Sequence, residues 1–328
     1  MARYRHNLPQ LSDHLFLADG GIETTLIFHN GFDLPYFAAF DLLRHTEGQQ
    51  ALDNYFRTYA ALAAENQVGL VLESATWRAS ADWAAKLGYT PEDLTQVQYQ
   101  AIQLLEAVRS QYDTERSPIV ISGCIGPQGD GYNPESFLTA EEAQVYHQPQ
   151  IAAFRDTEAD LVTAITMTYV QEALGITRAA QAVEMPVVIS FTVETDGRLP
   201  SGQALGDAIA QVDAATDNGP AYYMINCAHP SHFAHILATD EPWLKRIRGL
   251  RANASTKSHA ELDEAEDLDD GNPAELGHQY RELKQALPNL NVLGGCCGTD
   301  DRHIAAICQA CLPLWWNQAA GAGLLRRI

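Results

Sequence analysis

Short apolar runs rich in β-branched residues alternate with longer amphipathic stretches along almost the whole chain. Strands that are apolar on both faces are typical of a parallel sheet covered by helices. The predicted strands are residues 15–18, 68–72, 118–122, 161–165, 186–191, 221–225, 247–252 and 291–293. The helical spacing that follows each of them predicts helices over residues 50–67, 91–112, 141–158, 171–183, 204–218, 232–246, 273–286 and 301–312.

Eight strand–helix pairs in roughly 300 residues predict a closed (β/α)8 TIM barrel. An open, doubly wound sheet is the alternative. We expect one domain over residues 1–328, with residues 313–328 as a C-terminal tail. The apolar stretch 315–325 would either pack on the barrel or offer a surface for a partner, so a homo-oligomer is possible.

The composition is that of a globular protein, with 46% hydrophobic and 19% charged residues among 328. The net charge is −21 and there are only four lysines, which argues against nucleic acid or an anionic membrane as a partner. The N-terminal residues lack the apolar run of a signal peptide, and no stretch approaches the ~18 apolar residues needed to span a bilayer. We therefore expect a cytoplasmic protein.

Three cysteines form the most informative pattern of the chain. Cys296 and Cys297 lie within the sequence GGCCGT, and Cys227 precedes them by about seventy residues. Adjacent cysteines are poorly placed to pair with each other, whereas three thiolates make a sulfur site of the kind that zinc favours. Three protein ligands leave one tetrahedral position open, which is typical of a catalytic zinc, and we expect another sulfur to enter there.

The sequence around the remaining cysteines and the nearby histidines favours roles other than metal binding. Cys308 and Cys311 lie in an apolar helical pattern that predicts buried packing, and packing is also favoured over a site role for Cys124. The three histidines after Cys227 fit a loop leading into a helix, with Ser231 as its cap, better than they fit zinc ligands. They are His229, His232 and His235.

Unusual residues gather where the predicted strands end. In a barrel, these carboxyl ends surround one common mouth, so the residues there should lie close together. The glycines around Cys296 and Cys297 would permit a sharp turn that aims neighbouring side chains at one ion. The strand ends concerned are residues 19–24, 73–77, 123–127, 226–227 and 294–297.

From residue 15 to residue 312 the chain resembles the homocysteine S-methyltransferase family, which includes betaine- and S-methylmethionine-homocysteine methyltransferases. The matching motifs are Asp19-Gly20-Gly21 with Glu23, Gly126-Pro127, Asn226-Cys227 and residues 294–299.

The resemblance implies a zinc-dependent (β/α)8 barrel in which a substrate thiol takes the open zinc position and is methylated. It also implies that Cys227, Cys296 and Cys297 hold Zn²⁺, that Asn226 supports the metal loop, and that Asp19 and Thr76 are substrate-site positions. We place Glu23 among the substrate-binding candidates with them.

The chain departs from the family at two places that bear on the acceptor. Ile165 stands where members commonly carry a Glu that holds the homocysteine amino group, and Met224 stands where a Gly often precedes the Asn-Cys pair. Either the acceptor lacks an ammonium group or another acid substitutes. Glu194 is the preferred substitute and Glu73 the second choice.

The favoured function is a zinc-dependent S-methyltransferase that takes a small thiol and a sulfonium or quaternary ammonium donor. Zinc would lower the pKa of the bound thiol, and a cationic donor would suit an aromatic face such as that of Trp77. Two alternatives stay open: the thiol-activating component of a corrinoid- or folate-dependent system, and a non-catalytic zinc or redox sensor. The acidic segment 258–270 is expected to be solvated, with a closing lid as the alternative.

Overall fold

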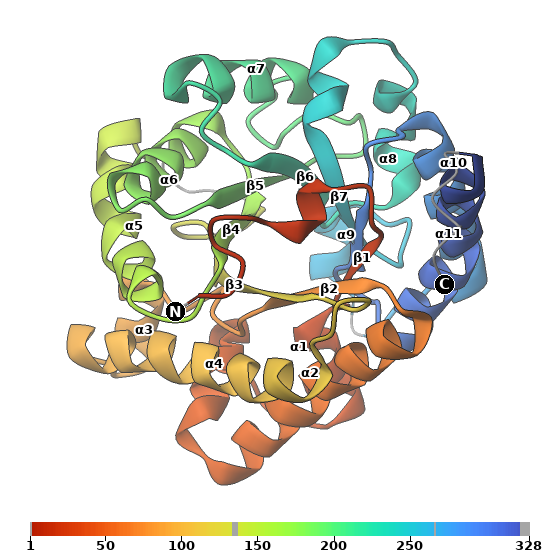
Figure 1. The fold of residues 1–328 in the computed structure, drawn as a ribbon. Coiled ribbons are helices and arrows are strands. Elements are labelled where there is room, and N and C mark those ends of the chain that lie inside the picture. The colour runs from red at the N-terminus through yellow and green to blue at the C-terminus, as the bar shows by residue number, and fades with distance from the viewer. Residues whose placement is uncertain (1, 133–136, 266, 322–328) are drawn as a thin grey trace.

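The computed structural model describes residues 2–132, 137–265 and 267–321, and it shows a closed barrel of parallel strands surrounded by helices (Figure 1). The strands pair in chain order, and β8 closes the barrel against β1. Their bounds are β1 Phe16–Ala18, β2 Gly69–Glu73, β3 Ile119–Ile125, β4 Leu161–Met167, β5 Val187–Thr192, β6 Tyr222–Asn226, β7 Ile247–Ala252 and β8 Val292–Gly295. The predicted (β/α)8 architecture is therefore confirmed, and the open sheet is excluded.

The helices lie outside the barrel and follow the strands in turn (Figure 1). The longer ones are α2 Thr46–Asn66, α4 Pro91–Tyr112, α5 Ala140–Arg155, α6 Val170–Ala182, α7 Leu205–Thr216, α8 Pro230–Leu237, α10 Pro273–Ala286 and α11 Asp301–Gly321. The short helices are α1 Ile22–Thr24, α3 Ala81–Lys86 and α9 His259–Asp263. No helix within the described ranges is long and apolar enough to cross a membrane.

The single helix predicted over residues 232–246 is wrong. The structure has α8 over Pro230–Leu237 and then a separate 3-10 turn, Pro242–Arg246. Pro242 explains the break, because proline has no N–H to donate and disfavours helical backbone in the residue before it.

The predicted tail also begins as a helix, since α11 continues to Gly321. Trp315 on this helix is 9% exposed, and its indole N–H donates to the Asp13 carbonyl at 2.5 Å. Trp315, the first residue of the apolar stretch 315–325, therefore packs on the barrel, while residues 322–325 lie outside the described residues.

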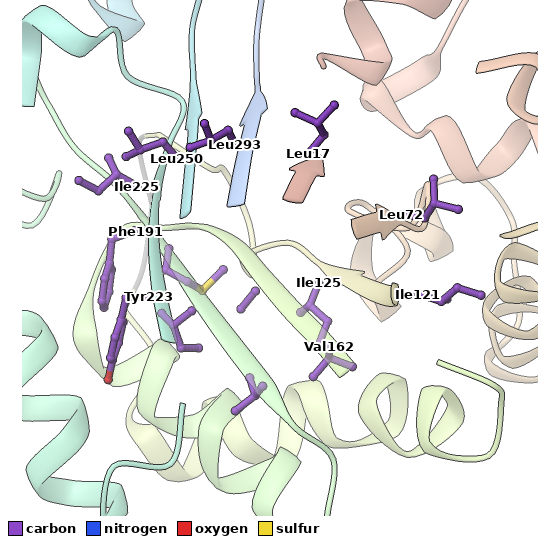
Figure 2. Close-up of a cluster of buried hydrophobic side chains, with 14 of the residues drawn as sticks. Leu17, Leu72, Ile121, Ile125, Val162, Phe191, Tyr223, Ile225, Leu250 and Leu293 are labelled. Atoms are coloured by element: carbon purple, nitrogen blue, oxygen red, sulfur yellow. The ribbon is translucent and has the colours of Figure 1, made fainter. Parts of the chain in front are cut away.

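Side chains alternate between two environments along each strand, as the two-residue period of a strand requires. One set faces the helices, and several of its members are drawn in Figure 2. The other set faces the barrel axis and packs into an apolar floor of Phe16, Val71, Val120, Leu161, Val188, Tyr222, Met224 and Val292. Two residues further along the strands, the axis-facing positions become polar, with Glu73, Ser122, Thr163 and Ser190. The barrel interior thus changes from apolar to polar toward the carboxyl ends of the strands.

Candidate functional site

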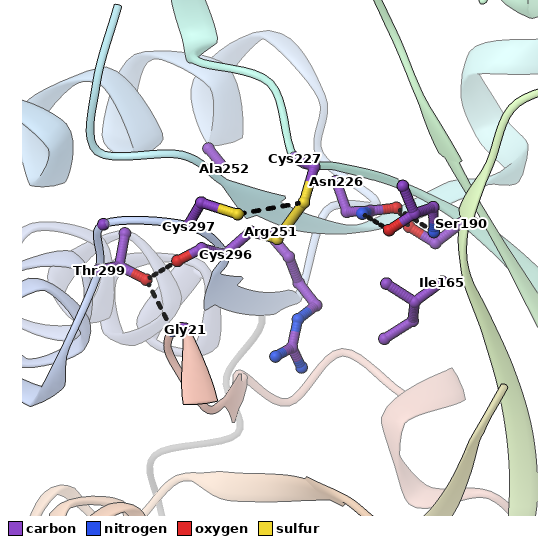
Figure 3. The surroundings of a disulfide bond; sticks show 12 residues. Gly21, Ile165, Ser190, Asn226, Cys227, Arg251, Ala252, Cys296, Cys297 and Thr299 are labelled. Atoms are coloured by element: carbon purple, nitrogen blue, oxygen red, sulfur yellow. Dashed lines mark hydrogen bonds between the residues drawn. A yellow bond between two sulfur atoms is a disulfide. The ribbon is translucent and has the colours of Figure 1, made fainter. Parts of the chain in front are cut away.

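The three predicted metal-binding cysteines meet at the mouth of the barrel. Their sulfur atoms lie within 4.8 Å of one another, although the cysteines come from two loops about seventy residues apart. Cys227 and Cys296 form a disulfide, and the Sγ of Cys297 lies 3.8 Å from that of Cys227 (Figure 3). The structure therefore brings together the sulfur atoms that the sequence singled out.

Strand β7 fixes both cysteine loops. The Cys227 N–H donates to the Arg251 carbonyl at 3.0 Å, and the Cys296 N–H donates to the Ala252 carbonyl at 2.9 Å. Cys227 adopts left-handed backbone with φ 53°, which non-glycine residues seldom do. These contacts hold the two loops in the geometry that gathers the sulfur atoms.

The turn after the cysteine pair is held by glycine and threonine, in agreement with the turn expected there. Gly298 has φ 77°, in the region that glycine tolerates best. The Thr299 hydroxyl donates to the Cys296 carbonyl at 2.7 Å and accepts the Gly21 N–H at 3.1 Å (Figure 3). The loop after β8 is thus tied to the loop after β1.

The sulfur atoms fit a zinc ion in their reduced form. Thiolates about 2.3 Å from a tetrahedral zinc lie roughly 3.8 Å from each other, which matches the separation of Cys227 and Cys297. As a disulfide, Cys227 and Cys296 present no thiolate, so metal binding by all three cysteines requires reduction of this bond.

Two side chains that the sequence reasoning missed lie against the sulfur atoms or their loop. The Tyr132 hydroxyl donates to the Sγ of Cys227 at 3.2 Å and lies 3.7 Å from the Sγ of Cys297. Burial, with a smaller contribution from Cys297, raises the pKa of Tyr132 well above its ordinary value, which keeps the phenol protonated. The Tyr132 ring packs on that of His259 with centroids 4.4 Å apart.

His259 connects the acidic segment to the site. Its Nε2 lies 2.5 Å from the Cys227 carbonyl oxygen, and its Nδ1 lies 3.2 Å from Oε1 of Glu194. The side chain is 10% exposed, so the expectation of a solvated segment over residues 258–270 is wrong at this residue. Glu194 lies beside the metal loop through this contact.

Asn226 joins the ends of β4, β5 and β6. Its Oδ1 accepts the Thr166 N–H at 3.0 Å and the Ser190 hydroxyl at 2.6 Å, and its Nδ2 donates to the Thr166 hydroxyl at 2.9 Å (Figure 3). Thr166 has φ 69°, which is strained for a β-branched residue. Asn226, fully buried, stabilises this conformation directly beside Cys227.

A buried layer of charge lies among the strand ends. Asp19 accepts a hydrogen bond from the Tyr55 hydroxyl at 3.0 Å and forms an ion pair with Arg251. Burial raises the pKa of Glu23 and the pKa of Glu73 to about 7. The predicted substrate residues Asp19 and Glu23 therefore share one environment with Glu73, which the sequence ranked behind Glu194.

Thr76 and Trp77, two further positions that the sequence singled out, both form contacts within the protein. The Thr76 hydroxyl is fully buried and donates to the Cys124 carbonyl at 2.7 Å. The Trp77 indole N–H donates to the Ile165 carbonyl at 3.1 Å, and the Arg78 guanidinium lies 4.1 Å from the Trp77 ring centroid. The aromatic face suggested for a cationic donor already contacts a cation.

The other cysteines and the three histidines after Cys227 do not belong to the three-cysteine cluster. Cys308 and Cys311 are fully buried on α11, which confirms their packing role, and Cys124 is 5% exposed within β3. The predicted Ser231 cap is wrong, because His229 caps α8 by accepting the Ser231 N–H at 3.2 Å.

Taken together, the fold and the site define a (β/α)8 barrel whose mouth carries a three-cysteine cluster suited to a metal ion. The profile of the family described as "Homocysteine S-methyltransferase" matches residues 16–311. The chain therefore belongs to the homocysteine S-methyltransferase family of enzymes.

Solved structures agree on the fold. The homocysteine methyltransferase MmuM from Escherichia coli in its oxidized form is 19% identical, with a TM-score of 0.74 over 93% of this chain and 98% of that chain. Its metallated form gives 18% identity and a TM-score of 0.74 over 93% and 99%. Its apo form is 19% identical, with a TM-score of 0.68 over 94% of this chain and 100% of that chain.

Proposed function

We propose that this protein is a zinc-dependent thiol S-methyltransferase in which Cys227, Cys296 and Cys297 hold Zn²⁺. The single observation that carries the proposal is the gathering of these three sulfur atoms within 4.8 Å at the barrel mouth. Three ligands leave a fourth position for the acceptor thiol, which is of the homocysteine type. Asp19, Glu23, Thr76, Glu194 and Asn226 remain candidates for binding substrate or supporting the metal loop.

When bound, zinc supplies a Lewis acid that lowers the pKa of the acceptor thiol. The acceptor sulfur then forms a bond to the donor methyl carbon, while the bond from that carbon to the donor's sulfonium sulfur or ammonium nitrogen breaks. The departing atom keeps the electron pair. The protein aligns the three atoms, and such positioning can supply roughly 7–11 kcal/mol of the barrier.

The chain's own residues contact the proposed metal ligands and the loop that carries Cys227. Tyr132 donates a hydrogen bond to a cysteine sulfur, and such donors reduce the electron density on a thiolate ligand. Asn226 precedes Cys227 and is bound to the end of β4, while His259 contacts the Cys227 carbonyl. A reducing compartment such as the cytoplasm would keep the three cysteines available for the metal.

The test is a direct assay of reduced, zinc-loaded protein. Homocysteine is incubated separately with S-methylmethionine, S-adenosylmethionine and betaine, and methionine is measured by mass spectrometry. Methionine formation that disappears in Cys297→Ser supports the proposal. If methyl transfer needs an added corrinoid or folate protein, the enzyme is the thiol-activating component of such a system instead.

A second function, redox sensing, is favoured by the disulfide between Cys227 and Cys296. A sensor would release zinc reversibly on oxidation and would show no turnover with any donor and thiol. Measured turnover in the assay above would exclude the purely non-catalytic form of this alternative.

A further inference from the structure

Arg251 is a cation inside the barrel that the three-cysteine chemistry does not explain. It pairs in register with Asn226 on β6 and Gly294 on β8, and it is 6% exposed. Its side chain leaves the backbone beside the cysteine loops and extends into the interior on the side where Ile165 lies (Figure 3).

Arg251 and Glu73 each carry a polar atom without a partner. Arg251 uses Nη2 to contact Asp19 and the Gly20 carbonyl, whereas its Nη1 is buried and has no hydrogen-bond partner among the described residues. Oε2 of Glu73 is likewise buried and has no hydrogen-bond partner among the described residues, and Glu73 is 5% exposed. Unpaired buried charged groups are rare in folded proteins, so these two atoms are suited to complementary charges on a ligand.

The positive charge near Glu73 is too small to offset the cost of burying its carboxylate. Burial is the largest cause of the pKa shift of Glu73. It outweighs the attraction of Arg251 and raises the pKa to about 7. An ammonium group beside the carboxylate would reverse this effect. Glu73 therefore has the properties of a binding group for a cation.

The alternatives for recognising an ammonium group are weaker. Ile165 at the end of β4 is 7% exposed and offers only an apolar side chain. The Glu194 side chain is 37% exposed and contacts His259. Of these positions, the interior carboxylate is that of Glu73.

We propose that the α-amino-acid end of the acceptor thiol binds between Arg251 and Glu73, with its carboxylate on Nη1 of Arg251 and its ammonium group on Oε2 of Glu73. This inference rests on the proposed function and specifies its acceptor as an α-amino acid thiol rather than a simple thiol. Arg251 and Glu73 replace, from β7 and β2, the recognition that Ile165 cannot provide from β4.

The test uses reduced protein loaded with cobalt, whose visible bands report a thiol entering the metal's open position. Four thiols are titrated: homocysteine, 4-mercaptobutanoate, 3-mercaptopropylamine and 1-propanethiol. They carry both charged groups, the carboxylate alone, the ammonium alone and neither. We expect the wild-type midpoint for homocysteine to be at least about tenfold lower than that for any other thiol, since a thiol that lacks one charge-assisted hydrogen bond binds more weakly by that order.

Two conservative variants assign the groups. Arg251→Lys keeps the charge opposite Asp19 and should raise the midpoints for homocysteine and 4-mercaptobutanoate about tenfold, with little change for the two thiols that have no carboxylate. Glu73→Gln should raise the midpoints for homocysteine and 3-mercaptopropylamine only. Arg116→Lys and Glu65→Gln, both exposed, are the matched controls and should change none.

Three results would overturn the inference. Equal midpoints for all four thiols in the wild-type protein would show that the end groups are not recognised, and this result needs no variant to fold. Equal shifts for all four thiols in Arg251→Lys would assign that residue a structural role only. If no thiol perturbs the wild-type cobalt spectrum, the proposed function itself fails and the inference fails with it.

Discussion

Glu73 illustrates how one buried carboxyl group can link stability to pH. Its pKa is raised to about 7 by burial, so the folded chain binds the proton more tightly than the unfolded chain does. The stability that this proton contributes is fully present below the unfolded pKa and is lost as the pH rises through 7. A group with these properties destabilises the ligand-free protein while it prepares the site for a cation.

Glu73→Gln removes this pH dependence, because glutamine cannot ionise. Relative to wild type, the variant should gain up to about 3 kcal/mol in free energy of unfolding between pH 5 and pH 8. Urea denaturation of both proteins at the two pH values measures this change, with Glu65→Gln as the exposed control. A stability difference between Glu73→Gln and wild type that stays constant across this range would contradict the prediction.

Cys297 is the proposed metal ligand whose replacement should disturb the fold least, because it is the exposed member of the three cysteines. We expect Cys297→Ser to weaken zinc binding by at least about tenfold, since removing even an outer partner of a metal ligand commonly costs that much. Competition with a chelator of known affinity measures the effect. Cys308→Ala is the control: it should retain zinc and be less stable by about 1 kcal/mol because of the cavity it leaves.

Arg251 shows why sequence reasoning singled out the three cysteines that the structure gathers and missed a buried cation that we propose as part of the substrate site. The cysteines are recognisable by residue type, whereas Arg251 interrupts an apolar strand that was assigned from its overall hydrophobicity. The overlooked signal was a charged residue at an axis-facing strand position. Tyr132 and His259 gave no such signal, because the loop and the acidic segment that carry them have no regular period.

At the scale of elements, the eight strands were predictable because a parallel barrel buries both faces of each strand and so makes its sequence continuously apolar. The predicted and observed bounds of β7 coincide at residues 247–252, and those of α4 at residues 91–112. The missed break in the region 232–246 reflects a proline within an otherwise helical spacing. The contacts between particular strand ends, such as that between Asn226 and Thr166, could be known only from the structure of the barrel.

Asn226 is the residue that connects neighbouring strand ends, so its replacement should affect several elements. Asn226→Ala leaves the Thr166 N–H and the Ser190 hydroxyl buried without their acceptor. We expect a cost of about 2–4 kcal/mol in urea unfolding, from the penalty for unsatisfied buried groups. Weaker zinc binding should accompany it, because Cys227 follows directly in the chain.

Asn272→Ala provides a matched comparison, since this exposed asparagine caps the N-terminus of α10 and, among the described residues, forms no hydrogen bond with the loop that carries Cys227. Removal of such a cap costs about 1 kcal/mol and should leave zinc affinity unchanged. Equal costs for the two variants would show that Asn226 does not connect the strand ends in the way proposed.

At the scale of the whole molecule, the proposed metal site joins two loops that are far apart in the chain but close together around the barrel mouth. Cys227 follows β6 and the other two cysteines follow β8, so an ion held by all three links loops on both sides of β7. A ligand that binds only the folded chain stabilises it by mass action, by about 4 kcal/mol at a thousandfold excess over its Kd. For a chain of this length, that corresponds to a rise in Tm of about 6 °C.

This gain should depend on the oxidation state of the cysteines. Reduced wild-type protein should show the rise in Tm with zinc in differential scanning calorimetry, whereas protein carrying the Cys227–Cys296 disulfide should show none, because two of the three thiolates are then missing. Reduced Cys297→Ser serves as the metal-deficient control and should respond weakly. An equal rise in the oxidised and reduced proteins would mean that zinc stabilises the barrel from a site other than the three cysteines.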